Sequence, residues 1–425
     1  MEELHLVKKI EICGLFFKDN CFDISFEKDI GIIVAGNGFG KTTVLRLIES
    51  FFLKKMIVFR DVIVDSFKVF FSDNTTVSVT QDRSKEIYEI SLSLNDNGKE
   101  EIRFEERNKD DDGDFYLSRI LKPRKEIFAV LPKWFQNMKL QDILFVETER
   151  LKLENSQSKA RPEEKELLAV ENYSEKIKNK ISKIRSDSLN NDAKVEDEMT
   201  LKLLQNFVNK EMEKKECKPQ EIVNLIEIFE KRKTELNNYG LLDETIKKDD
   251  DIVSRVLSSS KEKEVEKLFP FIELFYKTRL EKLDFFNGFH ERLKLFQNII
   301  NKKFNGAKDS QENWFAGKKF SINPSDGFKI EMEMDGRPIP ISKLSSGEQQ
   351  EIVMNYMLLF EKTDNQIVLI DEPEISLHVA WQRLFISDLK KIAAISNAKF
   401  IIATHSPDII DSNWDLVQEL KNASK

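Results

Sequence analysis

The sequence predicts an α/β fold in which a mixed sheet with an antiparallel β lobe is interrupted by a long α-helical insertion. Three apolar, β-branched runs, at 31–34, 366–371 and 399–404, are typical of buried strands. Shorter apolar runs between 9 and 105, separated by Asp, Asn and Gly, predict the antiparallel lobe. From about 151 to 300, apolar residues recur at helical spacing, which predicts the insertion.

Composition divides the chain into three regions. Residues 1–150 are predicted to form the first half of the α/β domain, 151–314 the helical insertion, and 315–425 the second half. The insertion is rich in Lys, Glu and Leu, and its Pro270 is expected to kink or restart a helix. Its length is too great for a simple connection, which favours a role in docking.

Bulk composition excludes several classes of protein. The 425 residues are 40% hydrophobic and 33% charged, as in a soluble globular chain with two or three domains' worth of core. Neither a long apolar run nor an apolar signal region is present, so no membrane span and no secretion signal are expected. Cys13, Cys21 and Cys217 make no paired pattern, which predicts a cytoplasmic protein without a zinc site. A net charge of −8 does not indicate a constitutive nucleic-acid binder, although it leaves room for a local basic patch.

The stretch AGNGFGKTT, residues 35–43, is the clearest functional motif. It lies between the run 31–34 and a predicted helix over 42–52, the context in which a glycine-rich turn binds phosphate. The backbone N–H groups of such a turn and the helix N-terminus favour phosphate oxygens. Lys41 is expected to reach the β- and γ-phosphates, and Thr42 to hold Mg²⁺. Ala35 stands where the usual pattern has glycine and adds one methyl group, which a negative φ tolerates.

Two more motifs follow buried strands. QIVLIDEPE, residues 366–374, ends in carboxylates, so Asp371 is placed to hold Mg²⁺ and Glu372 to take a proton from water. KFIIATHSP, residues 399–407, contains His405 directly after the last strand. A lone histidine is more often structural, but a place beside the strand of Asp371 favours a role in sensing the γ-phosphate.

LSSGEQQ, residues 344–350, precedes a predicted helix. Ser345 and Glu348 have the spacing of a capping box, so one interpretation is simply a well-capped helix. The other is a second anion site, because a glycine-containing helix start also binds anions.

Taken in order, these motifs resemble those of the ABC-type ATPase head, a P-loop NTPase. AGNGFGKTT looks like Walker A, LSSGEQQ like the signature motif, QIVLIDEPE like Walker B with its catalytic Glu, and His405 like the switch histidine. DEPE followed by SLH and THSP is similar to the OLD-like and SMC-related AAA family ATPases of bacteria. ILFVETERL, residues 143–151, looks like a stretch in ATPase subunits of anti-phage systems such as PARIS, Septu and certain retrons. The resemblance covers about 1–150 and 315–415.

The resemblance implies ATP and Mg²⁺ as ligands and assigns residues to them. Glu372 and His405 would carry catalysis, and Thr42 and Asp371 would hold the metal. The nucleotide would be bound by Walker A residues Gly36, Asn37, Gly38, Gly40, Lys41, Thr42 and Thr43. Ser345 and Gly347 of the signature motif would bind the nucleotide of a second copy across a head-to-tail interface.

The sequence departs from the family pattern at three places. Ala35 replaces the first Walker glycine, and Ser346 replaces one signature glycine, which leaves the hydrolysis rate open. Glu149 occupies a plausible Q-loop position with a different residue type. OLD nucleases carry a Toprim domain after the head, whereas only residues 406–425 follow His405, so the chain is expected to lack one.

Three functions remain open at this point. The first is an ATPase that forms a homo-oligomer and acts as sensor or scaffold for a separate effector protein in anti-phage defence. The second is a RecF/SMC-like ATPase of DNA repair or maintenance, for which Lys176, Lys180 and Lys183 share one predicted helical face. A transporter-coupled ATPase is the weaker third, since the insertion and His378 differ from transporter motifs.

Overall fold

The computed structural model describes ten stretches of the chain. They are 4–15, 21–36, 40–82, 89–107, 126–147, 169–189, 218–242, 262–305, 317–361 and 364–419. Contacts divide the chain into two units, one formed by residues 1–162 with 346–425 and the other by 163–345. Each unit buries apolar residues of its own.

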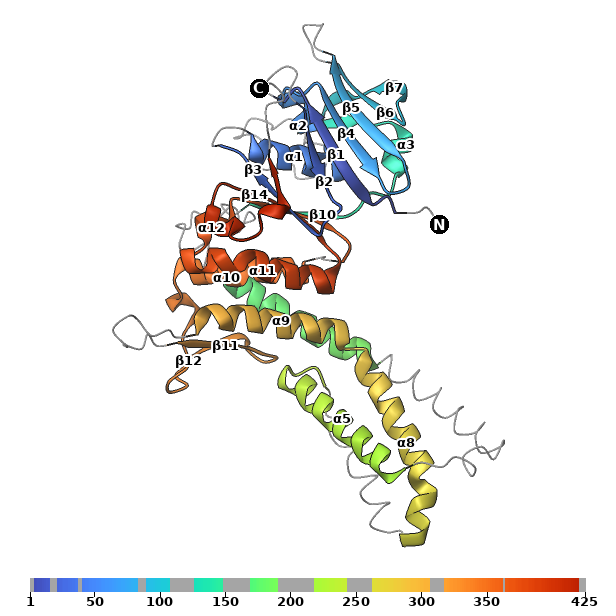
Figure 1. The fold of residues 1–425 in the computed structure, drawn as a ribbon, viewed down its shortest axis with the longest axis vertical. Helices are drawn as coiled ribbons and strands as arrows, with labels where there is room; N and C mark the ends of the chain where they lie inside the picture. The colour runs from blue at the N-terminus through green and yellow to red at the C-terminus, as the bar shows by residue number, and fades with distance from the viewer. Residues whose placement is uncertain are drawn as a thin grey trace, which may run out of the picture. The chain divides into compact units, whose positions relative to one another are not determined.

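A five-stranded parallel sheet forms the centre of the first unit (Figure 1). Its order is β10-β13-β14-β3-β15, and all four pairings are parallel. The strands are β3 (Ile30–Val34), β10 (Ile143–Glu147), β13 (Ile367–Asp371), β14 (Lys399–Thr404) and β15 (Val417–Glu419). Every residue of β13 is buried, as expected of a strand covered on both faces. The sheet therefore unites strands from before and after the second unit, which confirms the predicted α/β fold class.

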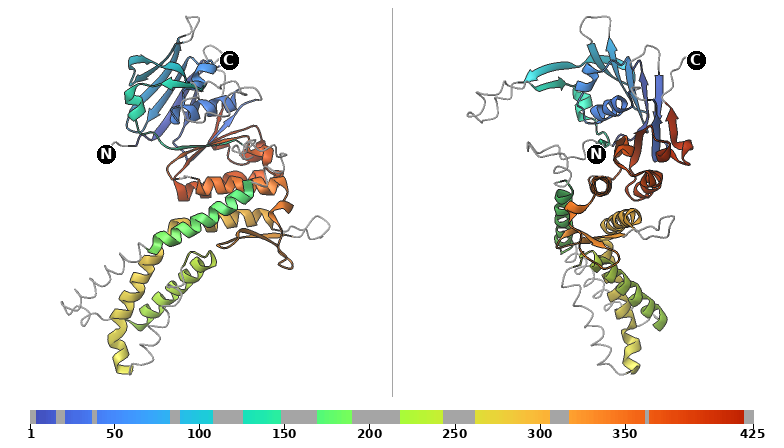
Figure 2. Two further views of the ribbon diagram at one scale, coloured as in Figure 1. Left: turned by 180° about the vertical axis from the view of Figure 1, so that it is seen from behind. Right: turned by 90° about the vertical axis from the view of Figure 1, so that its left-hand side faces the viewer.

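Helices cover both faces of this sheet. In Figures 1 and 2, α1 (Lys41–Phe52) lies on one side, and α10 (Ser346–Phe360) and α11 (Val379–Ser396) lie on the other. Helix α1 begins directly after the glycine-rich turn. It buries the four apolar residues at helical spacing, Val44, Leu45, Leu47 and Ile48, and also Phe51 and Phe52. Short helical turns follow the strand ends: η5 (Pro373–Ser376), α12 (Pro407–Ile410) and η6 (Trp414–Leu416).

A six-stranded antiparallel sheet forms the predicted lobe. Its order is β2-β1-β4-β5-β6-β7, with β1 (Val7–Cys13), β2 (Cys21–Ser25), β4 (Ser66–Phe71), β5 (Thr76–Asp82), β6 (Glu89–Leu94) and β7 (Asn97–Glu101). Burial alternates along β4, so one face of the sheet packs inward. Phe51 of α1 packs against Phe67 of β4 and Phe135 of α3 (Lys133–Asn137), with ring centroids 5.5 and 5.2 Å apart. One core therefore joins the lobe to α1. A separate pair, β8 (Arg103–Arg107) and β9 (Glu126–Val130), and α2 (Ile57–Asp61) complete this part.

The second unit is mainly helical. It contains the helical residues 169–189, α5 (Pro219–Asn238), α8 (Glu262–Asp284), α9 (Asn287–Phe304), the hairpin β11 (Lys318–Asn323) to β12 (Gly327–Met332), and η4 (Ile341–Lys343). Ile177 and Ile181 are fully buried, as their helical spacing predicts. The hairpin groups with this unit because Phe320 packs on Phe296 of α9, with ring centroids 5.3 Å apart. The sequence boundary at 315 instead assigned the hairpin to the second half of the α/β domain.

Two details differ from the sequence expectations. Helix α8 runs through Pro270 as one element, so of the expected kink or restart the restart does not occur. Cys13 and Cys21, expected to be unpaired, are joined by a disulfide, because the β1–β2 pairing sets them directly opposite one another. Their pairing depends on strand register, which spacing in the sequence did not reveal.

A search of the helices in the described ranges finds none with both the length and the apolar character needed to cross a membrane.

Candidate functional site

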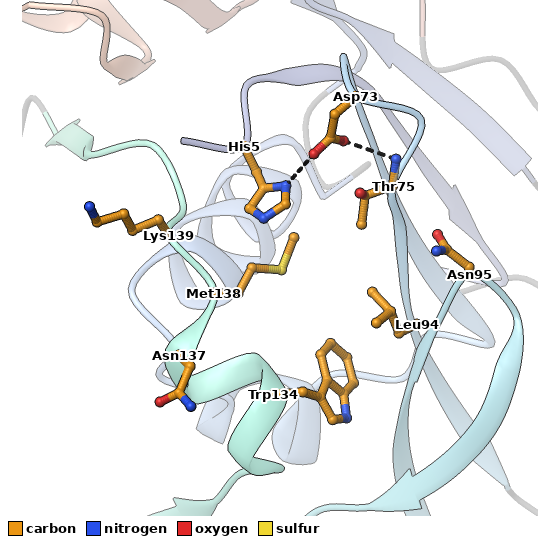
Figure 3. A pocket seen from close by; sticks show the side chains of 9 residues that line it. All are labelled: His5, Asp73, Thr75, Leu94, Asn95, Trp134, Asn137, Met138 and Lys139. Carbon is orange, nitrogen blue, oxygen red and sulfur yellow. Dashed lines mark hydrogen bonds and ion pairs between the residues drawn. The ribbon is translucent and has the colours of Figure 1, made fainter. Parts of the chain in front are cut away.

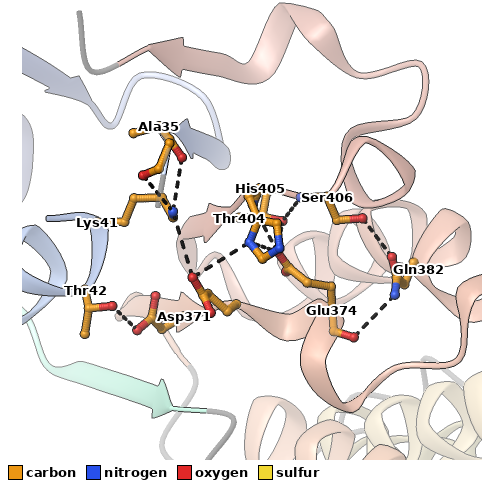
Figure 4. Close-up of polar contacts among 11 residues, drawn as sticks. Ala35, Lys41, Thr42, Asp371, Glu374, Gln382, Thr404, His405 and Ser406 are labelled. Carbon is orange, nitrogen blue, oxygen red and sulfur yellow. Dashed lines mark hydrogen bonds and ion pairs between the residues drawn. The ribbon is translucent and has the colours of Figure 1, made fainter. Parts of the chain in front are cut away.

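The predicted catalytic motifs meet at one edge of the parallel sheet. Parallel pairing brings the carboxyl ends of β3, β10, β13 and β14 to the same edge, the usual ligand site of open α/β sheets. Asp371 ends β13, and its register partners are Glu147 on β10 and Ala403 on β14. His405 follows β14, and Lys41 begins the helix after β3 (Figure 4).

Lys41 lies in the described part of the phosphate-binding turn. Gly40 caps α1 with φ of 81°, a left-handed conformation that glycine adopts without strain. The Lys41 side chain is 4% exposed, and its Nζ lies 3.1 Å from the carbonyl oxygen of Ala35 and 3.8 Å from Glu372 Oε1. Of the predicted glycine-rich residues, Gly36 and Gly40 are described, whereas Asn37 and Gly38 lie outside the described residues.

Thr42 and Asp371 are brought together as predicted. The Thr42 hydroxyl donates to Asp371 Oδ2 over 2.7 Å, although the two residues are far apart in sequence. Burial raises the pKa of the Asp371 carboxyl above its ordinary value. The neighbouring charges of Glu372 and Glu147 raise this pKa further, whereas the hydrogen bond from Thr42 and the charge of Lys41 oppose the shift.

This donor set fits Mg²⁺. The ion takes oxygen ligands and is usually held by one or two carboxylates together with water and substrate phosphates. A hydroxyl and a carboxylate at 2.7 Å supply such oxygens, and the concentrated negative charge beside Asp371 favours a cation. No group of three or more His, Cys, Asp or Glu suited to a metal occurs among the described residues, so a richer all-protein cage is not formed there.

Glu372 has an unusual backbone. Its φ is 45° and its ψ is 55°, a left-handed conformation that costs a residue with a Cβ of the order of 1 kcal/mol or more. Its backbone N–H donates to the carbonyl oxygen of Ala403 on β14 over 2.8 Å, which holds the turn in place. The side chain is 28% exposed and places Oε1 3.8 Å from both Lys41 Nζ and His405 Nδ1. Strained residues of this kind concentrate at functional sites.

Glu374 is a site residue that the sequence reasoning missed. Its Oε1 accepts hydrogen bonds from the Thr404 hydroxyl at 2.8 Å and from the His405 backbone N–H at 2.9 Å, and it lies 3.0 Å from His405 Nδ1 (Figure 4). The second glutamate of DEPE could have identified Glu374 as a candidate site residue. A strand followed by a turn, however, does not reveal which way that side chain points.

Glu147 is a second missed residue. Its side chain is 12% exposed, it pairs in register with Asp371, and Arg46 Nη2 lies 3.4 Å from its Oε1. Glu149, which the sequence suggested for the Q-loop position, lies outside the described residues.

The signature residues occupy the predicted helix start. Gly347 lies in the first turn of α10, and Ser345 directly precedes that helix in the other unit. Thr43 is half-buried in the first turn of α1. The roles of these three residues in binding nucleotide stay predictions.

A pocket of about 390 Å³ lies elsewhere, in the antiparallel lobe (Figure 3). Its lining comes from the N-terminal segment, the strand turns and the end of α3: His5, Asp73, Thr75, Leu94, Asn95, Trp134, Asn137, Met138 and Lys139. None of these residues belongs to the phosphate-binding turn or to the ends of β13 and β14, so this pocket is separate from the site described above.

The chain is similar to one protein family and to several known proteins. A family model described as an AAA ATPase domain matches residues 7–410. The OLD nuclease of Thermus scotoductus is 30% identical over 111 residues, which is 25% of this chain and 21% of that protein. The Retron Ec83 probable ATPase of Escherichia coli is 29% identical over 151 residues, or 32% of this chain and 27% of that protein. The matched part thus spans roughly a quarter of each relative's own length.

The chain is also similar to solved structures. The SMC head domain from Thermotoga maritima aligns with a TM-score of 0.40 at 11% identity, covering 97% of this chain and 94% of that chain. An Smc head domain from Pyrococcus furiosus with an extended coiled coil, bound to the C-terminal domain of ScpA, aligns with a TM-score of 0.38 at 17% identity. That alignment covers 96% of this chain and 91% of the other.

Proposed function

The chain belongs to the AAA ATPase domain family, and on that premise we propose that it binds ATP with Mg²⁺, hydrolyses it, and acts as a sensor or scaffold that controls a separate effector protein in bacterial anti-phage defence. One observation supports the enzymatic part most directly. Glu372 Oε1 lies 3.8 Å from both Lys41 Nζ and His405 Nδ1 at the strand edge, beside the hydrogen-bonded pair Thr42 and Asp371.

In this proposal each residue of the site has one task. Lys41 pairs with the β- and γ-phosphates, and Thr42 and Asp371 hold Mg²⁺, which neutralises charge on the phosphates. Glu372 accepts a proton as the oxygen of a water bonds to the γ-phosphorus. The bond from that phosphorus to the β–γ bridging oxygen breaks, so ADP and phosphate leave. His405 contacts the γ-phosphate region from the neighbouring strand.

The proposed assembly is a homo-oligomer closed by ATP. Ser345 and Gly347 of a second copy would contact the γ-phosphate, so ATP would gain contacts only in the closed state. A ligand that binds one state better shifts the population toward that state. Hydrolysis would then reset the balance between closed and open forms.

The defence role is supported by relatedness. One relative is a retron's probable ATPase and another is an OLD nuclease, and both match the chain only in part. The second unit, with its helices and hairpin, is the proposed surface for the effector. A cytoplasmic location is part of the same proposal, but the Cys13–Cys21 disulfide removes the argument for it from unpaired cysteines.

A DNA repair or maintenance role is the second candidate, and it depends on a basic helical face. Of its three lysines, Lys183 is exposed, and Lys176 Nζ lies 4.7 Å from the ring centre of Tyr173. The chain's net charge of −8 weighs against extensive phosphate contacts.

The test begins with Glu372→Gln. Because the amide cannot accept the proton, the turnover number should fall by about 10²- to 10⁴-fold while ATP still binds. Glu101→Gln, on the exposed strand β7, is the matched control and should hydrolyse ATP as the wild type does. If Glu372→Gln turned over at the wild-type rate, the catalytic assignment would be wrong.

The same variant identifies the partner. Glu372→Gln protein, recovered from its native host with ATP and Mg²⁺, is analysed by mass spectrometry and by absorbance at 260 nm before and after nuclease treatment. A second protein at near-stoichiometric amount with little nucleic acid supports the sensor and effector role. Excess nucleic acid without a fixed protein partner supports the DNA role, and Lys176, Lys180 and Lys183 become the next residues to change.

A further inference from the structure

We infer that Glu374 is the positioning residue for His405: its carboxylate fixes the backbone and the ring of that histidine and selects which ring nitrogen faces the reaction. This inference rests on the proposed function for its catalytic consequence. The arrangement itself is visible in the geometry around one oxygen atom, Glu374 Oε1 (Figure 4).

Three groups converge on that oxygen. The Thr404 hydroxyl is 2.8 Å away, the His405 backbone N–H 2.9 Å, and the His405 ring Nδ1 3.0 Å. The first two are donors, and a carboxylate oxygen only accepts. The ring Nδ1 lies 3.0 Å from the same acceptor, so the inferred arrangement requires Nδ1 to carry its hydrogen.

Burial makes the anchor rigid while the ring stays accessible. The Glu374 side chain is 7% exposed, whereas the His405 side chain is 46% exposed. An exposed side chain samples several rotamers within nanoseconds unless it is held. The carboxylate removes this freedom for His405, since it binds both the backbone and the ring of the same residue.

The anchor is itself supported by neighbours on α11. Gln382 Nε2 donates to the backbone carbonyl oxygens of Glu374, at 3.3 Å, and of Leu377, at 3.2 Å. Gln382 Oε1 accepts from the Ser406 hydroxyl over 2.8 Å. The turn that carries Glu374 and the segment that carries His405 are thus tied to one buried amide, so their spacing is held from both sides.

The distances from His405 Nδ1 also give the two glutamates different roles. Glu372 Oε1 is 3.8 Å from His405 Nδ1, and Glu374 Oε1 is 3.0 Å from the same atom. Glu374, being closer, takes the ring hydrogen. Without it, Glu372 is the carboxylate left within 4 Å, and the ring would turn toward the proposed proton acceptor. With Nδ1 held by Glu374, Nε2 is the nitrogen that can meet a phosphate oxygen or a water.

The arrangement follows a known chemical logic. A carboxylate that accepts from one ring nitrogen of a histidine sets its tautomer and orientation for work at the other nitrogen. Misplacing a catalytic group by about 1 Å costs about 100-fold in rate. Loss of Glu374 should therefore lower turnover while leaving the phosphate contacts of Lys41 in place.

The experiment is a double-mutant cycle between Glu374 and His405. Glu374→Ala should lower the turnover number by about 10- to 100-fold, with the Kd of ATP changed by less than about twofold. In the His405→Ala background the same substitution should have almost no further effect, because the residue acts through the histidine. Equal losses in both backgrounds would overturn the inference.

A conservative variant separates positioning from folding. Glu374→Gln keeps an oxygen that accepts from Thr404 and from the His405 backbone, so it should fold as the wild type does and recover part of the turnover lost in Glu374→Ala. Glu101→Ala on exposed β7 is the matched control and should leave turnover unchanged. A Glu374→Ala protein whose turnover falls only in proportion to its folded fraction would contradict a positioning role.

One readout does not depend on hydrolysis. The chain has four histidines, so ¹⁵N spectra of the imidazole rings can be assigned with His405→Ala. Wild type should show His405 as the Nδ1–H tautomer, and Glu374→Ala should lose that preference. If the tautomer is as expected but His405→Ala turns over normally, the proposed role of His405 fails and the positioning stands. If the tautomer is unchanged in Glu374→Ala, the inference fails whatever the activity.

Discussion

The side chains of the candidate site contact partners that are distant in the sequence. Thr42 meets Asp371 and Lys41 approaches Glu372, in each case across more than half of the sequence. Glu372 reaches its position through a left-handed backbone that other residues must hold, here the N–H bond to Ala403. Such strain persists only where the surroundings compensate for it.

Lys41→Ala tests the residue on which nucleotide binding is proposed to depend most. The buried ammonium lies in the phosphate-binding turn, so its loss should raise the Kd of ATP at least about tenfold, a change of about 1.4 kcal/mol. Binding of a fluorescent ATP analogue measures the change. Lys54→Ala, which removes another partly buried lysine of the same unit, serves as the control and should leave the Kd as it is. Unchanged affinity in Lys41→Ala would remove the turn from the proposed site.

At the scale of elements, the backbone directly after β1 leaves little room for a side chain. Gly14 has φ of 70°, and a Cβ placed on it would lie 1.9 Å from Asp65 Oδ2 and 2.6 Å from Asp65 Cβ. The backbone N–H of Asp65 donates to the carbonyl oxygen of Cys13, so this neighbour is itself fixed beside the strand. The close approach links the end of β1 to the start of β4.

Gly14→Ala should therefore destabilise the first unit more than the same substitution at a matched glycine elsewhere in the lobe. Gly98 also has a positive φ, 51°, but a Cβ there meets nothing within 4 Å. Both substitutions carry the backbone penalty, and only the first forces Asp65 to move, so the unfolding free energies should differ by about 1 to 3 kcal/mol. Urea denaturation of both variants gives the two values. Equal losses would mean that Asp65 simply rotates away.

The whole molecule consists of two units with separate buried interiors. These proposed ATP-site residues all belong to the first unit: Lys41, Thr42, Asp371, Glu372 and His405. The second unit has its own stabilising contacts, such as Ser174 Oγ, which accepts from the Phe328 N–H over 2.8 Å. Multi-domain proteins often depart from a single unfolding step.

Calorimetry should resolve two unfolding transitions. ATP with Mg²⁺ should raise the midpoint temperature of the first unit's transition only. At 100 times its Kd, ATP adds about 2.7 kcal/mol to the stability of the unit that binds it. Lys41→Ala should reduce that shift by at least about 1.3 kcal/mol at the same ATP concentration. Ser174→Ala, which removes the hydroxyl that accepts from the Phe328 N–H, should lower only the other transition, by about 1 to 3 kcal/mol. A single transition that ATP shifts as a whole would show that the units unfold together.

The amino-acid sequence by itself determined the strands, the phosphate-binding turn and the residues at the strand ends, and the family match confirms the recognition of an ATPase. Periodicity and turn chemistry are local, so they can be recognised without knowing which segments pair. Only the tertiary structure decided which residues become neighbours. Glu374 joined His405, Glu147 came beside Asp371, Cys13 met Cys21, and the hairpin packed on α9. Each of these depends on strand register or packing between separate segments, where a shift of one residue turns every side chain to the other face.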